Sequence, residues 1–199
     1  MKMKIAITGG IGSGKTTVLK LLSNLGYKVF SSDEIVCGLY QTNKVKRKLK
    51  KLFPDAVSGF FNLTIDRKKI SQTVFYDKKK HLELTNLITP LVLEEIQRQT
   101  TDVEGLCFVE VPLLFECGYQ EYFDDVWVVM RNLSDRIEAV KLRSNLTEEQ
   151  INARINNQVD YLSLDLSKYT VINNDGDVHE LTREIDKQLH ALINKKAIN

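Results

Sequence analysis

The feature that most constrains this chain is a glycine-rich segment near its amino end. Residues 9–16 read GGIGSGKT and match the pattern G-x-x-x-x-G-K-[ST]. A short apolar run at residues 4–8 precedes the segment and a helical pattern at residues 15–25 follows it, so the segment is predicted to join a buried strand to a helix. Glycines let the backbone turn its N–H groups inward, and the helix start adds unpaired donors. The sequence therefore predicts a phosphate-binding loop, or P-loop.

This loop predicts a nucleoside triphosphate and Mg²⁺ as ligands. We expect Lys15 to reach the β- and γ-phosphates and Thr16 to offer its hydroxyl to Mg²⁺. The residues of the loop that are predicted to bind the nucleotide are Gly10, Ile11, Gly12, Ser13, Gly14, Lys15, Thr16 and Thr17.

Short apolar runs alternate with longer helical patterns along the rest of the chain, which is typical of βαβ units and a parallel sheet covered on both faces. We predict five strands, at residues 4–8, 28–31, 106–111, 126–130 and 169–172. The fold class is therefore α/β, a doubly wound five-stranded parallel sheet of the P-loop type. We expect the second strand to lie beside the first.

About 70 residues between the second and third strands contain no strong strand pattern, which is more than a crossover needs. We predict helices there at residues 33–53, 66–75 and 79–101, with Pro90 starting or kinking a helix. The chain is predicted to be one domain with a core at residues 1–32, 104–131 and 165–199, an inserted helical substrate lobe at about 33–103 and a helical lid at about 132–163. Thr147 and Gln150 form a capping-box pattern in the lid, and residues 178–194 are predicted to form the last helix.

The composition limits the partners of the chain. Its 28 Lys and Arg against 26 Asp and Glu give a net charge of +2, which argues against nucleic acid or a membrane as the main partner. Cys37, Cys107 and Cys117 show no C-x-x-C spacing, so neither a disulfide framework nor a zinc site is expected. No apolar run approaches the roughly 20 residues of a membrane span, and no signal peptide is expected. We expect a cytoplasmic enzyme, whose oligomeric state the sequence leaves open.

Two carboxylates are candidates for a role beside the phosphates. Glu110 lies near the end of the third predicted strand, where an acid can help to hold Mg²⁺, and pairing with a surface base explains it equally well. Asp33 follows the second strand at the carboxyl edge of the sheet, where a group that accepts the proton of an acceptor hydroxyl belongs. On residue chemistry alone, capping of the helix that begins there explains Asp33 as well.

P-loop folds include molecular switches, motors and small-molecule kinases, so the loop alone does not select a function. A guanine-specific switch needs an Asn-Lys-x-Asp set after a later strand. Neither Asn43-Lys44 nor Asn194-Lys195 is followed by that Asp, which argues against a GTPase.

Nearly the whole chain resembles the dephospho-CoA kinase family. The specific matches are residues 8–18, TGGIGSGKTTV, and residues 111–116, VPLLFE; shorter matches follow in order at residues 65–67, 74–77, 87–92, 125–129, 154–158 and 171–176. The resemblance implies transfer of the γ-phosphate of ATP to the 3′-hydroxyl of the ribose of dephospho-CoA, the last step of coenzyme A synthesis. It also implies Mg²⁺ as cofactor, with ATP and dephospho-CoA as the small-molecule substrates.

The resemblance assigns roles to individual residues. Asp33 stands where these kinases carry their general base, and Arg143 aligns with a lid arginine that we expect to close over the transferring phosphoryl group. For Arg154, which shares a predicted helix face with Gln158, packing of the lid is an equal alternative to nucleotide binding. The complete predicted set is Asp33, Lys15 and Arg143 for catalysis, Arg154 and Asn174 together with the loop for the nucleotide, and Thr16 and Glu110 for the metal.

The sequence departs from the family pattern at several positions. Thr89 precedes Pro90 where members usually have His, and Ala139 replaces one of two lid arginines. Arg136 lies three residues before Ala139 on the same predicted helix face and is our candidate to replace that arginine. The alternatives to a dephospho-CoA kinase are another small-molecule or nucleoside monophosphate kinase and a regulatory module that binds ATP without transferring phosphate.

Overall fold

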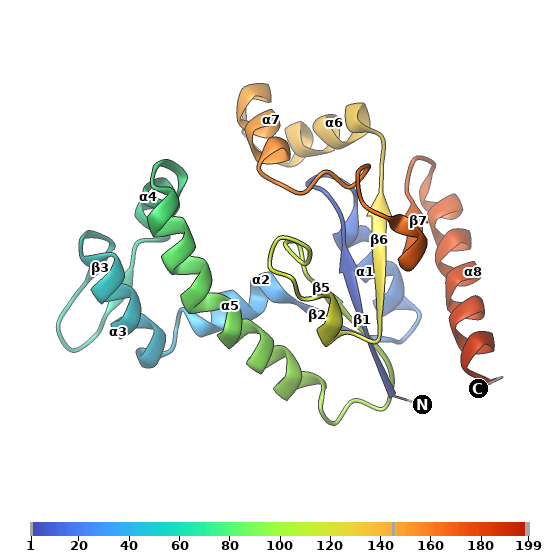
Figure 1. The fold of residues 1–199 in the computed structure, drawn as a ribbon, viewed down its shortest axis with the longest axis horizontal. Coiled ribbons are helices and arrows are strands. Elements are labelled where there is room, and N and C mark those ends of the chain that lie inside the picture. Colours follow the sequence, from blue (N-terminus) through green and yellow to red (C-terminus); the bar gives the residue numbers. More distant parts are fainter. Residues whose placement is uncertain (1, 145, 198–199) are drawn as a thin grey trace. The chain divides into compact units, whose positions relative to one another are not determined.

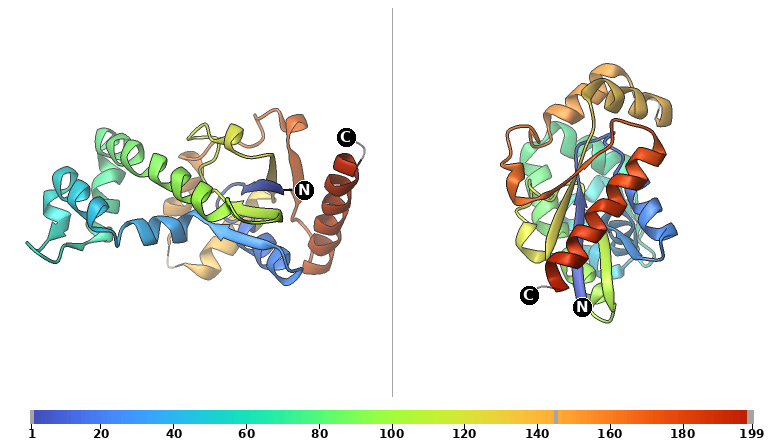
Figure 2. Two further views of the ribbon diagram at one scale, coloured as in Figure 1. Left: turned by 90° about the horizontal axis from the view of Figure 1, so that it is seen from below. Right: turned by 90° about the vertical axis from the view of Figure 1, so that its right-hand side faces the viewer.

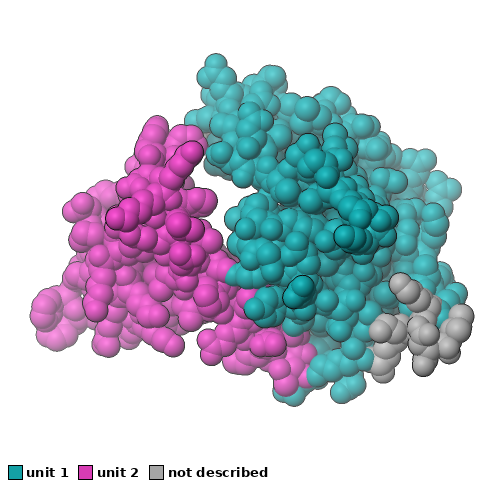
Figure 3. All heavy atoms as spheres, in the orientation of Figure 1, with its two compact units in different colours: residues 1–30, 102–199 teal, residues 31–101 magenta. Residues whose placement is uncertain are grey.

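The computed structural model of the chain describes residues 2–144 and 146–197. Its contacts divide the chain into two compact units, one of residues 1–30 and 102–199 and one of residues 31–101, which are coloured separately in Figure 3. The first unit carries the main sheet and the phosphate-binding loop, and the second is mostly helical. Each unit is described by itself.

The main sheet has five strands, as predicted. They are β1 (Lys2–Thr8), β2 (Lys28–Ser31), β5 (Gly105–Glu110), β6 (Asp125–Met130) and β7 (Thr170–Asn173), in the order β2-β5-β1-β6-β7 (Figure 1). The pairs of β1 with β5, β1 with β6 and β6 with β7 are all parallel. The expectation that the second strand lies beside the first is wrong, because β5 lies between β1 and β2.

A hydrophobic core cluster of the first unit lies on one face of this sheet. Side chains alternate along a strand, so Ile5 and Ile7 of β1 point to the same face and join Phe108 and Trp127, whose rings are 5.2 Å apart. Helices α1 (Lys15–Asn24) and α8 (Val178–Ala197) cover this face with apolar side chains that include Leu22 (Figure 1, Figure 2). The packing fixes β1 and α1, and therefore the two ends of the loop that joins them.

Two helices of the first unit form the predicted lid region. They are α6 (Leu133–Arg143) and α7 (Glu148–Asn156), and the capping box of Thr147 and Gln150 at the start of α7 is confirmed. Lys141 and Glu148 join the two helices through an ion pair of 2.6 Å. Short 3₁₀ turns at Gln120–Tyr122 and Leu166–Lys168 complete this unit. No helix within the described ranges is long and apolar enough to cross a membrane.

The second unit contains more breaks than the sequence predicts. The single helix expected at residues 33–53 is wrong: α2 (Ser32–Leu39) and α3 (Asn43–Leu52) are separated by a turn, and the Thr42 side chain caps α3 by accepting from the Val45 amide. A small hairpin of β3 (Val57–Ser58) and β4 (Thr64–Ile65) follows a 3₁₀ turn at Pro54–Ala56.

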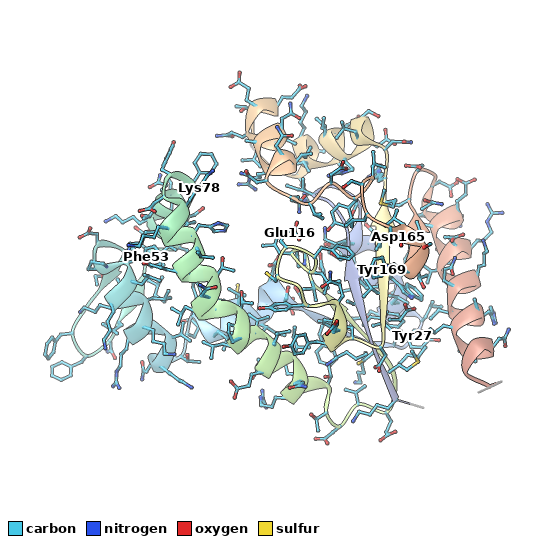
Figure 4. The ribbon with its side chains drawn as sticks, viewed as in Figure 1. Tyr27, Phe53, Lys78, Glu116, Asp165 and Tyr169 are labelled. Carbon is cyan, nitrogen blue, oxygen red and sulfur yellow. The ribbon has the colours of Figure 1, made fainter. Side chains whose placement is uncertain are left out.

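The two remaining helices of the second unit are α4 (Arg67–Tyr76) and α5 (Lys78–Thr100). Asp66 and Asp77 cap them, each with a side chain that accepts from a backbone amide of the first turn. No new helix begins at Pro90, which lies inside α5. Lys80 in the first turn of α5 lies over the ring of Phe53 at the end of α3; Phe53 and the neighbouring Lys78 are labelled in Figure 4.

The core on α1 gives a direct test of this packing. Leu22→Ala is expected to lower the free energy of unfolding by about 2–5 kcal/mol, because Leu22 is fully buried and its truncation leaves a cavity against β1 and α8. Leu25→Ala is the matched control at the end of the same helix, since Leu25 is 48% exposed, and should cost less than about 1 kcal/mol. Urea unfolding followed by circular dichroism measures both values, and equal losses would contradict this assignment of the core.

Candidate active site

The phosphate-binding loop lies where the sequence predicts it, between the end of β1 at Thr8 and the start of α1 at Lys15. Gly12 and Gly14 have φ of +79° and +97°, in the left-handed region that side chains other than glycine rarely adopt. At Gly14 a side chain would also overlap the amide group of Asn174. These glycines are therefore required by the shape of the loop, as in loops that bind anions through backbone N–H groups.

The side chain of Lys15 lies along the loop. It is 8% exposed, and its ammonium group donates to the carbonyl oxygens of Gly9 at 2.8 Å and Gly10 at 3.2 Å. Thr16 and Thr17 in the first turn of α1 are exposed. A cation and several N–H donors are thus gathered at a helix start, which is an arrangement that suits an anion.

Three side chains from distant parts of the chain hold the loop. The Arg136 Nε on α6 donates to the carbonyl oxygen of Ile11 at 2.9 Å, and the Gln158 Oε1 accepts from the amide of the same residue at 2.7 Å. The amide group of Asn174, directly after β7, donates to the carbonyl oxygen of Ser13 at 2.8 Å. Both backbone groups of Ile11 are therefore fixed by side chains.

Arg136, our candidate to replace the missing lid arginine, lies against the loop through its bond to Ile11, a contact that the sequence did not predict. Burial lowers the pKa of its guanidinium from the ordinary value, but an arginine stays charged at physiological pH. A side chain at Gly10 would overlap this guanidinium, so glycine at that position gives Arg136 its room. The site therefore holds a second cation beside Lys15.

A cavity of about 840 Å³ opens beside the loop within the first unit. Two of the residues around it carry buried polar atoms, Ser13 Oγ and Arg131 Nε, that have no hydrogen-bond partner among the described residues. Buried polar atoms are normally paired, so their orphaned state fits a polar ligand in this space. The cavity is lined by Gly10 and Ser13 of the loop, by residues 129–133 and Arg136, by Ile155, Asn156 and residues 158–162, and by Leu166, Val171, Asn173 and Asp175.

Glu110 lies at the carboxyl end of β5, paired with Ile7 of β1, and is half-buried. The strand that carries it is thus the neighbour of the strand that leads into the loop, as a metal-holding acid requires. Within the described ranges, no group of three or more His, Cys, Asp or Glu side chains could hold a metal ion by itself. Thr16 and Glu110 suit Mg²⁺ instead as a cation bound chiefly through phosphate oxygens, with few protein ligands.

The remaining predicted residues lie apart from these contacts or in the second unit. Arg143 in the last turn of α6 and Arg154 near the end of α7 have exposed side chains. Asp33 is exposed in the first turn of α2, and the capping explanation for it is wrong, because the cap is Ser31, whose Oγ accepts from the Glu34 amide.

Sequence reasoning misplaced one residue of this site and missed another. Gln158 was expected on the helix face of Arg154, but α7 ends at Asn156 and Gln158 turns back to the loop. Tyr161, whose hydroxyl lies 3.2 Å from Thr8 Oγ1, was not predicted at all. Tyrosines in loops carry no signal of such a contact, since it joins residues 153 positions apart.

Comparison with known proteins identifies the family of the chain. A family model described as dephospho-CoA kinase matches residues 3–180. A curated dephospho-CoA kinase of Thermus thermophilus is 32% identical over 189 residues, which cover 94% of this chain and 91% of the relative. A curated dephospho-CoA kinase of Fusobacterium nucleatum is 31% identical over 192 residues, which cover 93% of this chain and 96% of the relative.

Solved structures agree with these relatives. A structure from Thermus thermophilus, 32% identical, has a TM-score of 0.84 and covers 96% of this chain and 98% of its own. A dephospho-CoA kinase from Campylobacter jejuni is 26% identical and has a TM-score of 0.69. The match covers 98% of this chain and 100% of that structure. A shikimate kinase from Acinetobacter baumannii shares the fold. It is 15% identical and has a TM-score of 0.58, and the match covers 98% of this chain and 96% of that structure.

A GxxxxGK[ST] loop at the carboxyl edge of a five-stranded parallel sheet, together with these structural relatives, defines the class as P-loop kinases. Within that class the match is specific, because the family model spans most of the chain. The chain belongs to the dephospho-CoA kinase family.

The contact of Arg136 with the loop can be tested by nucleotide binding. Arg136→Gln is expected to raise the Kd for ATP about tenfold, because it removes a positive charge and a charge-assisted hydrogen bond to Ile11. Isothermal titration calorimetry measures the change. Arg183→Gln on the exposed surface of α8 is the matched control and should leave the Kd unchanged; equal effects of the two variants would contradict a local role for Arg136.

Proposed function

We propose that this protein is a dephospho-CoA kinase, which transfers the γ-phosphate of ATP to the 3′-hydroxyl of the ribose of dephospho-CoA in the cytoplasm. The observation that carries the proposal is the P-loop braced by Arg136, Gln158 and Asn174 in a chain that belongs to this family. ATP binds with its phosphates on the loop at residues 10–17. Its nucleoside occupies the adjoining cavity.

The second unit binds the acceptor. Residues 31–101 contain 13 Lys and Arg against 8 Asp and Glu, a net charge of +5, whereas the rest of the chain contains 15 and 18, a net charge of −3. The pyrophosphate of dephospho-CoA is negatively charged, so the excess of positive charge in this unit favours it. Lys44, Lys48 and Lys51 of α3 are exposed and available for this role.

Transfer requires one proton to leave the acceptor. The carboxylate of Asp33 accepts the proton of the 3′-hydroxyl while the oxygen of that hydroxyl bonds to the γ-phosphorus. The bond from the γ-phosphorus to the bridging oxygen of the β-phosphate breaks, and ADP leaves. Asp33 is exposed in the first turn of α2, directly after β2.

The other groups neutralise charge on the phosphoryl oxygens. Lys15 binds the β- and γ-phosphates, and Arg143 closes over the transferring group from the lid. Arg154 binds the nucleotide from α7. Thr16 and Glu110 would hold Mg²⁺, which would supply positive charge beside the phosphates.

Product analysis tests the proposed reaction. The protein with ATP, Mg²⁺ and dephospho-CoA should give one product heavier by a single phosphate in mass spectrometry. Shikimate, gluconate and AMP, offered as acceptors under the same conditions, should give none. Product from one of these instead would identify a different P-loop kinase, and ATP binding without any product would indicate a regulatory module.

Substitution of the proposed base separates chemistry from binding. Asp33→Asn should lower kcat by about 10²–10⁴ with an unchanged Kd for ATP, because it removes the proton acceptor and leaves the P-loop intact. The neighbouring Glu34→Gln is the matched control, since Glu34 is also exposed in the first turn of α2, and should retain kcat. Steady-state kinetics measures both, and full activity of the Asp33 variant would refute its role as base.

A further inference from the structure

The segment that follows α7, residues 157–162, is attached to the phosphate-binding loop at two points, and we call it the strap. Gln158 holds the amide of Ile11 at 2.7 Å, and the Tyr161 hydroxyl lies 3.2 Å from Thr8 Oγ1. These contacts hold the loop at Ile11, near its middle, and at Thr8, the strand residue that precedes it. The strap also lines the cavity beside the loop with residues 158–162.

The Tyr161 hydroxyl lies where β1 ends and the phosphate-binding loop begins. We call this junction, Thr8 and Gly9, the hinge. The hydroxyl bonds to Thr8 Oγ1 and lies near the backbone of Gly9, so one phenol oxygen is placed at the point where β1 ends. Gly9 has a φ of +146°, and a side chain there would overlap the carbonyl oxygen of Val129. The hinge thus has a backbone shape that side chains seldom adopt.

Burial makes this bond hard to replace. Thr8 is fully buried and Tyr161 is 5% exposed. The same burial raises the pKa of Tyr161 to about 12, so the phenol stays protonated over the physiological range. Without the hydroxyl, the buried Thr8 hydroxyl would lose its partner, which costs more than the loss of an exposed hydrogen bond.

The far side of the strap is anchored to the loop after β5. The amide of Val159 donates to Glu116 Oε1 at 2.9 Å, and the ring of Tyr161 lies edge-on to Phe115 at 5.8 Å. Figure 4 shows Glu116 on that loop and labels Tyr169, whose ring packs on the same Phe115 at 5.2 Å. Tyr161 and Tyr169 thus share a packing partner, but only Tyr161 has a hydroxyl bond to the phosphate-binding loop among the described contacts.

We propose that Tyr161 is a positioning residue for the triphosphate: its hydroxyl holds Thr8 at the end of β1, so that the loop that follows keeps the shape that receives the β- and γ-phosphates. The proposal deepens the assigned function, because it rests on this loop as the ATP site. Tyr161 acts through the loop and touches no phosphate. Loss of the Tyr161 hydroxyl should therefore weaken the binding of ligands that contact the loop. It should leave the binding of ligands that contact chiefly the cavity almost unchanged.

Two measurements on Tyr161→Phe test this role, with Tyr169→Phe as the matched control. Hydrogen exchange of residues 9–14, followed by mass spectrometry without nucleotide, should become faster in Tyr161→Phe and stay unchanged in the control. The Kd for ATP should rise about tenfold in Tyr161→Phe while the Kd for AMP changes less than about twofold, as expected for the loss of hydrogen bonds at the loop. The control should match the unsubstituted protein for both nucleotides.

A role in stability alone predicts a different pattern. It would lower the melting temperature of Tyr161→Phe but leave both Kd values and the exchange of the loop unchanged well below that temperature, and this result would overturn the proposal. Thr8→Val removes the other partner with little change of volume and should reproduce the ATP defect even if Tyr161→Phe folds poorly. A failure of the unsubstituted protein to bind ATP would instead refute the assigned function, whereas the exchange measurement would still report on the hinge.

Discussion

The site depends on one constraint: the amides of the phosphate-binding loop must point toward a common centre before any phosphate arrives. Glycine geometry permits that shape but does not enforce it, since glycine is free to adopt many others. The structure enforces it with side chains. Arg136 and Gln158 fix the two backbone groups of Ile11, and Asn174 fixes Ser13. Because the loop already has its shape, less conformational entropy is lost when a nucleotide binds, and the affinity is higher.

The three side chains that hold the loop come from three different elements of the first unit. Arg136 belongs to α6, Gln158 to the strap after α7, and Asn174 to the end of β7. Each therefore links the loop to a part of the first unit that also lines the cavity or lies next to it. Since Arg136 and Gln158 both line the cavity and hold the loop, a ligand that fills the cavity meets a loop already held in place.

The sequence predicted what depends on local pattern. The five strands, the loop and the capping box of Thr147 and Gln150 were found because period, glycine spacing and cap chemistry are all readable within a few residues. The break between α2 and α3 was missed because Tyr40-Gln41-Thr42 contains neither glycine nor proline, and only the cap formed by Thr42 marks it. Strand order was misjudged, and Tyr161 missed, because both depend on contacts between residues far apart in the chain.

The most direct test of this account is a crystal structure with Mg²⁺ and a non-hydrolysable ATP analogue. The account predicts that the phosphates lie on the loop at residues 10–17 and that the Lys15 ammonium leaves the carbonyl oxygens of Gly9 and Gly10 for phosphate oxygens. Arg136, Gln158 and Asn174 should keep their bonds to the loop. A triphosphate bound elsewhere, or a loop that releases these three side chains when it binds, would contradict the central claim.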